Sequence, residues 1–264
     1  MVIQQKLLVI IYCLALALCA IMAFWIFVFP STFRASPSND YGKFLEKTMN
    51  TSPFRPSLMT KYKNHPAVQF LHILPAGAWS VCMPLQLMPA VRKSFPALHR
   101  LVGWASAISS TLLFVSVFII QHRKLDYIDS EYALEFTSFL ERAASAPAPY
   151  NTSLSLLLRM VPCFTSISAV WFMLCIIAAL RCILRRDVRS HRIWMIRHLG
   201  SGLGVAVQRC VVLVCARRGM TPTDQMLRFT EGIYVGFFLS VLAAEVAVRC
   251  IRAGEHEPGG NKRL

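Results

Sequence analysis

The chain has 264 residues, of which 55% are hydrophobic and only 16% are charged, and its formal net charge is +15. In a water-soluble domain roughly a quarter of the residues are charged, so this composition excludes an ordinary soluble domain. The basic residues are spread over many short segments between apolar runs, which favours contact with anionic lipid head groups and argues against nucleic-acid binding.

Six apolar runs follow one another along the chain, each long enough to cross a bilayer as a helix. A crossing requires roughly 20 residues, because a helix rises about 1.5 Å per residue through hydrocarbon about 30 Å thick. The predicted spans are Leu7–Phe29, Pro66–Ala90, Leu98–Ile120, Leu156–Leu180, His191–Val214 and Phe229–Val248. We therefore expect an all-α, multipass transmembrane helix bundle, since the strands of a membrane barrel are shorter and alternate in polarity.

These spans divide the chain into four parts. They are an N-terminal transmembrane anchor (1–30), a long loop (31–65), a transmembrane bundle (66–252) and a tail (253–264). A second long loop (121–155) interrupts the bundle, and the apolar spacing between Leu125 and Ala144 predicts a surface helix within it. The first apolar run is longer than the core of a signal peptide, which favours an anchor that stays in the protein.

Short loops rich in arginine and lysine predict the orientation. One separates the second span from the third, another separates the fourth from the fifth, and such loops stay in the cytoplasm. Both termini are therefore expected in the cytoplasm, and both long loops on the other side of the membrane. The sequence does not distinguish the plasma membrane from an internal membrane. Asn50 and Asn151 begin Asn-x-Ser/Thr sequons in these outer loops, so both are candidates for glycosylation.

Ionisable residues inside the spans indicate where function lies, because such groups are costly in hydrocarbon and usually face the bundle interior. The candidates for a polar core are His72, His198, Arg209, Glu231 and Glu245. We expect Arg209 to pair with Glu231 near the outer end of the bundle. Glu245 is expected to pair with Arg249, one turn further along the same helix.

The third and fifth spans both begin at the predicted cytoplasmic face, so His99 and His191 are expected at a similar depth near that face. Two facing histidines can hold a haem iron in both axial positions, which makes haem b a candidate cofactor. Arg100 and Arg192 are the candidates to meet the haem propionates. His198 is the alternative partner for His99 if the two helices are offset.

Other interpretations of the same residues stay open. A histidine beside an arginine at a helix start also suits lipid phosphates or neighbouring carbonyl groups. The polar faces that carry His72, near the opposite membrane face, and His198 would suit a transporter for a small solute or a proton. A non-catalytic membrane scaffold requires only the helix bundle. The sequence has no nucleophile–base arrangement, phosphate-binding loop or thiolate metal motif, and it leaves enzymatic activity and protein partners open.

Several short strings of residues in this part of the chain form a wider pattern. They are His72, Pro84-Leu85-Gln86, Arg92, His99-Arg100 with Gly103, and His191-Arg192-x-Trp194-Met195-x-Arg197 with Arg209. The pattern resembles the predicted multipass membrane proteins catalogued as domain of unknown function 2306, over about residues 66–209. The resemblance implies a helical membrane bundle with recurring histidines at His72, His99 and His191, and no established activity. The histidines on helices are also loosely similar to those of di-haem transmembrane cytochromes of the b561 sort.

Overall fold

The computed structural model describes residues 2–28, 43, 47, 62, 65–123, 125, 150–215 and 222–255. Its elements in chain order are α1 (Val2–Val28), α4 (Pro66–Val68), the π-helix η1 (Gln69–Ile73), α5 (Leu74–Leu87), α6 (Pro89–Ser94), α7 (Pro96–His122), α9 (Tyr150–Leu184), α10 (Val188–Cys215) and α11 (Pro222–Glu255). Six stretches of helix in these ranges are long and apolar enough to cross a membrane. The predicted all-α multipass bundle is therefore confirmed.

The predictions for the two long loops have different outcomes. Of the predicted surface helix at 125–144 only Leu125 is described, and the sequon at Asn50 lies outside the described residues. Asn151 was expected in a loop, but it lies in the first turn of α9, because this helix begins at Tyr150, before the apolar run itself.

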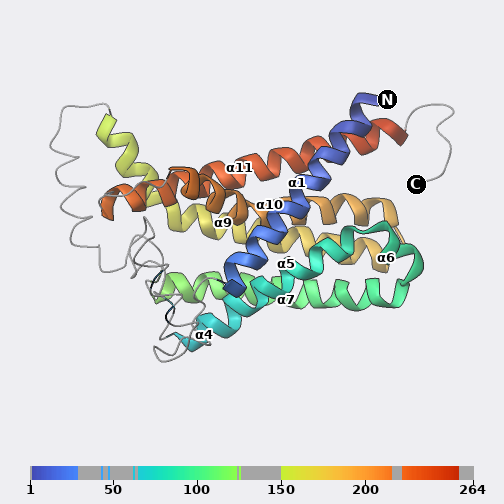
Figure 1. Cartoon of the computed structure of the whole chain (residues 1–264), viewed down its shortest axis with the longest axis horizontal. Coiled ribbons are helices and arrows are strands. Elements are labelled where there is room, and N and C mark those ends of the chain that lie inside the picture. Colours follow the sequence, from blue (N-terminus) through green and yellow to red (C-terminus); the bar gives the residue numbers. More distant parts are fainter. Residues whose placement is uncertain are drawn as a thin grey trace.

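The long helices lie side by side, and the described parts of both termini lie at the same end of the bundle (Figure 1). Close packing joins α5 to α7, α7 to α9, α9 to α10 and α10 to α11, while α1 packs across α5 and α10. Within the described helices, α7 and α10 are not among the pairs that pack closely. They face each other across the interior, which leaves room between them for side chains.

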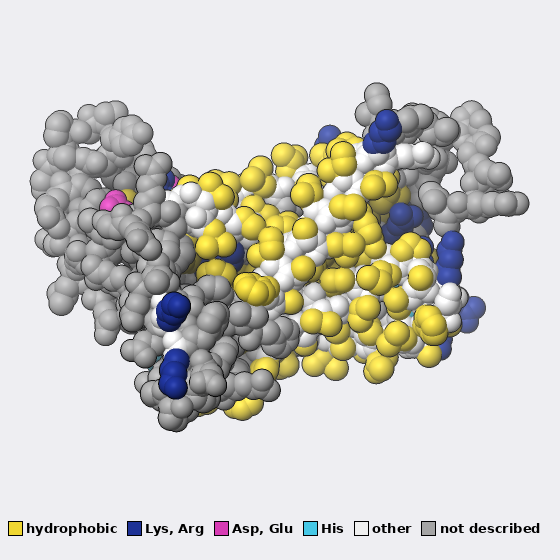
Figure 2. Space-filling model, viewed as in Figure 1, with side chains coloured by type: hydrophobic (Ala, Val, Ile, Leu, Met, Phe, Trp, Pro, Cys, Tyr) yellow, Lys and Arg dark blue, Asp and Glu magenta, His cyan; other side chains and the backbone are white. Residues whose placement is uncertain are grey.

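The outer surface matches a lipid environment. Figure 2 shows hydrophobic side chains covering the middle of the visible face, with lysine and arginine towards the two ends. Exposed basic residues gather at the end where α7 and α10 begin, which we call the basic end. They are Lys6, Arg92, Lys93, Arg100, Arg181, Arg185, Arg186, Arg189, Arg192, Arg249 and Arg252.

Prolines explain the irregular second span. Pro75 has no backbone N–H, so the regular helical ladder is interrupted there and the turn before it widens into η1, where the Leu74 N–H bonds to the Gln69 carbonyl. The span ends at Met88, whose backbone is extended (φ −68°, ψ 117°), because a residue before proline avoids the helical region. The helix is therefore shorter than the predicted Pro66–Ala90.

A tight turn between α9 and α10 fixes where α10 begins. Arg186 adopts a left-handed conformation (φ 61°), and Asp187 then caps α10 by accepting a 2.9 Å hydrogen bond from the Ser190 N–H. Hydrogen bonds from the Ser190 side chain and backbone hold the pKa of Asp187 below its usual range. His191 follows in the same turn, with its N–H bonded to the Asp187 carbonyl at 3.0 Å.

The tightest interface, between α10 and α11, depends on glycine. A Cβ atom on Gly236 would collide with the Gly204 carbonyl oxygen and lie 2.8 Å from the Gln208 nitrogen. A Cβ on Gly200 would lie 2.5 Å from the Ala244 side chain. Small residues let two helix backbones approach closely, which is a main source of attraction between helices in lipid.

We expect Gly236→Ala to destabilise the protein by about 1–3 kcal/mol, because the added methyl group meets backbone atoms that cannot move aside. Thermal unfolding of the detergent-purified protein measures the effect. Gly103→Ala is the matched control, since a Cβ there would meet only the Gln86 side chain at an ordinary 3.6 Å. Equal melting temperatures for the two variants would contradict the proposed role of the interface.

Candidate functional site

His198 on α10 lies at the centre of the bundle and is completely buried. Its Nε2 atom lies 3.1 Å from the indole nitrogen of Trp79 on α5 and 3.1 Å from the hydroxyl of Ser110 on α7. Its Nδ1 atom lies 3.1 Å from the carbonyl oxygen of Phe172 on α9, and the Phe172 ring stacks on the imidazole. One side chain on α10 therefore contacts three other spans.

The partners of His198 define its protonation pattern. The Trp79 indole N–H can only donate, so Nε2 accepts, and Nδ1 carries the proton that is donated to Phe172. The Ser110 hydroxyl donates to the Ser106 carbonyl at 2.7 Å, so it does not need the imidazole as an acceptor. Both nitrogens of a neutral ring are engaged, which argues against His198 as the alternative iron ligand.

His99 lies in the first turns of α7, half-buried near the basic end. The Gln86 side chain of α5 donates a 2.6 Å hydrogen bond to the His99 backbone carbonyl, which ties the two helices together at this depth. The Nδ1 atom of the His99 ring is buried and has no hydrogen-bond partner. Buried polar atoms nearly always have a partner, so an orphaned imidazole nitrogen points to a metal or another polar group beside it.

His191 lies at the same end of the bundle, in the first turns of α10. Its Nδ1 atom lies 2.9 Å from the backbone carbonyl of Ala179 on α9, so Nδ1 carries a proton and Nε2 keeps its lone pair. Metal-ligating histidines usually donate the other ring N–H to a carbonyl or carboxylate in this way. The arrangement suits ligation through Nε2.

The two histidines come from helices that face each other across the interior. In the described helices the backbones of α7 and α10 are not closely packed, and His198 of α10 reaches Ser110 of α7 across the interior. Both histidines lie at the basic end, but His99 is eleven residues before Ser110 whereas His191 is seven residues before His198, so their similar depth stays a prediction. Arg100 and Arg192 follow them in sequence and are exposed at the basic end.

His72 lies away from this pair, towards the opposite end of the bundle. Its Nδ1 atom lies 2.9 Å from the Ser116 hydroxyl, and the ring of Tyr62 meets its edge at 6.4 Å between centroids. Ser116 donates its own proton to the Leu113 carbonyl at 2.6 Å, so the histidine is the donor in the pair. The expectation that His72 lies far from His99 and His191 agrees with these contacts.

Both expected ion pairs are wrong. Glu245 on α11 pairs with Arg197 on α10 through two hydrogen bonds of 2.6 and 3.0 Å, and Arg249 adds only longer-range attraction. Exposed Glu231 pairs with Arg228, one turn earlier on the same helix, at 2.7 Å.

Arg209 was expected to meet Glu231, but its guanidinium lies over the rings of Trp25 and Phe229, at 5.2 and 5.4 Å from their centroids. Aromatic faces attract a cation in a desolvated setting, which accounts for an arginine inside a span.

Among the described residues, no group of three or more His, Cys, Asp and Glu side chains could hold a metal ion. A haem iron is different, because the porphyrin supplies four ligands and the protein needs only two. The donor set of His99 and His191 fits that requirement.

Comparison with known proteins gives no further guidance: no protein-family model, no curated protein and no solved structure matches the chain. The resemblance to the family of unknown function therefore stays a prediction, and the geometry carries the functional argument.

We expect His198→Phe to lower the stability of the protein by about 1–3 kcal/mol, because the ring volume is kept while the buried Trp79 N–H loses its acceptor. Thermal unfolding of His198→Phe, Trp79→Phe and the double variant forms a cycle. The double variant should be more stable than the two single losses predict, by about 1 kcal/mol. Additive losses would mean that the 3.1 Å contact contributes nothing.

Proposed function

We propose that this multipass membrane protein binds a b-type haem between His99 and His191, close to the basic end, and carries electrons within the membrane. The observation that carries the proposal is the contrast between the two rings. His191 is held by a carbonyl in the orientation typical of an iron ligand, and His99 has a buried nitrogen without a partner.

The neighbouring residues have roles that follow from their chemistry. Gln86 holds the backbone at His99 and the capped turn at Asp187 holds the start of α10, so both ligands sit on rigid helices. Arg100 and Arg192, at the basic end, would compensate the propionate charges. The haem itself would supply reversible one-electron chemistry.

Polar contacts elsewhere in the interior favour this proposal over a solute or proton pathway. The hydroxyls of Ser106, Ser110 and Ser116 on α7 each donate to a carbonyl of their own helix at 2.6–2.9 Å. The two interior histidines beside them, His72 and His198, also have partners. Because these polar groups are already hydrogen-bonded to the protein, they do not require water, which is typical of a closed interior and not of a water-filled path.

The orientation and the lipid contacts form part of the same proposal. The basic end lies in the cytoplasm, with both termini on that side, because short basic connections are retained there. Its exposed arginines meet anionic lipid head groups, each contributing about 1 kcal/mol of attraction near such a surface.

We expect the full-length protein, expressed with ample haem and purified in detergent, to show a Soret band and a b-type reduced-minus-oxidised spectrum. His99→Ala and His191→Ala should each abolish or strongly reduce this spectrum, since both imidazole side chains would be needed to hold the haem. The measurement is the visible difference spectrum per mole of protein.

His122→Ala is the matched control, because this exposed histidine lies at the other end of α7 and should leave the spectrum unchanged. Monodisperse elution of all three variants excludes misfolding as the cause of a loss. A featureless wild-type spectrum, or an unchanged spectrum in both ligand variants, would overturn the proposal and favour a transport or scaffold role.

A further inference from the structure

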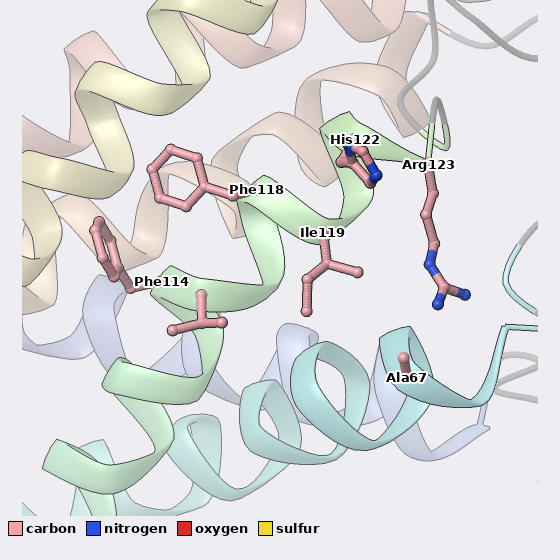
Figure 3. A pocket seen from close by; sticks show the side chains of 7 residues that line it. Ala67, Phe114, Phe118, Ile119, His122 and Arg123 are labelled. Atoms are coloured by element: carbon pink, nitrogen blue, oxygen red, sulfur yellow. The ribbon is translucent and has the colours of Figure 1, made fainter.

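A groove of about 440 Å³ opens between the end of α7 and the start of the second span, at the opposite end from His99 and His191. Figure 3 shows Phe114, Phe118 and Ile119 on α7, and Ala67 across from them on α4. The lining is completed by Val115, His122 and Arg123. The groove is therefore apolar along its length and basic at one end.

The basic end of the groove has an exposed cation. Arg123 is exposed, and in Figure 3 its side chain extends from the end of α7 towards the helix that carries Ala67. Among the described residues, no carboxylate forms an ion pair with Arg123. Exposed His122 lies beside it, so an anion at this rim would meet only basic side chains of the groove.

The position of the groove matches the polarity gradient of a bilayer. Both α7, which ends at His122, and the second span, which begins at Pro66, reach the edge of the apolar layer here. Phe114 lies nine residues before Arg123, which corresponds to about 13 Å of helix rise towards the hydrocarbon. The basic rim therefore lies at head-group level and the phenylalanines lie deeper.

We propose that the groove binds one anionic phospholipid, with an acyl chain along Phe114, Phe118 and Ile119 and its phosphate at Arg123. A soluble anion would contact only the basic end of the groove, and a lipid without net charge would contact mainly its apolar part. This site is independent of the haem proposal, because it lies at the other end of the bundle.

The test is native mass spectrometry of the full-length protein in detergent, titrated with dioleoyl phosphatidylglycerol or with dioleoyl phosphatidylcholine. We expect the first phosphatidylglycerol to bind about fivefold more tightly than phosphatidylcholine, the effect of one basic residue near a membrane surface. Arg123→Gln should remove this preference. Val115→Trp, at an exposed lining position, should weaken binding of both lipids by filling the groove.

Two matched variants separate the groove from the rest of the surface. Arg228→Gln removes an exposed arginine that is not part of the lining, and Val81→Trp enlarges an exposed valine on α5. Both should bind lipid like the wild type. Equal affinity of the wild type for the two lipids, or equal losses in the groove variants and their controls, would overturn the proposal.

Discussion

The rest of the bundle depends on the hydrogen bonds of the His198 ring. Hydrocarbon offers no water to a donor or acceptor without a partner, so polar groups inside a membrane protein must satisfy one another. His198 does so with the Trp79 indole on α5 and the Phe172 carbonyl on α9, and its ring also lies 3.1 Å from the Ser110 hydroxyl on α7. Because each partner sits at a set depth on its own helix, these contacts fix the register of four spans. Through that register they also fix the depths of the two other histidines. His191 lies about two turns before His198 on α10, and His99 lies about three turns before Ser110 on α7.

Two different kinds of contact join α10 to its neighbours. Towards α11 the helix presents Gly200 and Gly204, and the two backbones approach until a single methyl group would not fit. Towards α7 it presents imidazole rings, and the two helices stay apart. Lipid gives no hydrophobic drive for helix association, so the tight interface contributes much of the attraction and allows the other side to remain wide.

Much of the fold could be predicted from the sequence, because the bilayer imposes a length and a polarity on every span. The interior positions of Trp79, Ser110 and His198 also follow from helical periodicity. The lateral contacts between helices do not follow in this way, and the two ion pairs were assigned wrongly for opposite reasons. Glu231 was expected to pair with Arg209 on the neighbouring helix, whereas its partner Arg228 lies one turn earlier on the same helix. Sequence spacing suggests partners on the same helix, such as Arg249 for Glu245, whereas the bonded partner, Arg197, comes from a neighbouring helix. The partners that orient His191 and His198 are the backbone carbonyls of Ala179 and Phe172, which leave no signal in side-chain chemistry.

Among the interior histidines, the hydrogen-bond partners of the rings distinguish His99 from the others. In the middle, His198 has partners for both nitrogens, and further out His72 is paired with Ser116. Near the basic end the buried His99 nitrogen lacks a hydrogen-bond partner, as do three buried atoms elsewhere in the described helices, namely Ser168 Oγ, Arg209 Nε and Thr230 Oγ1. Burying such a nitrogen unpaired costs about 1–3 kcal/mol, a cost that a purely structural histidine would avoid by accepting a bond or by giving way to an apolar residue. The surrounding arginines would make this end favourable for an anionic group. The proposed site therefore combines a buried imidazole nitrogen without a partner with the most basic surface of the bundle.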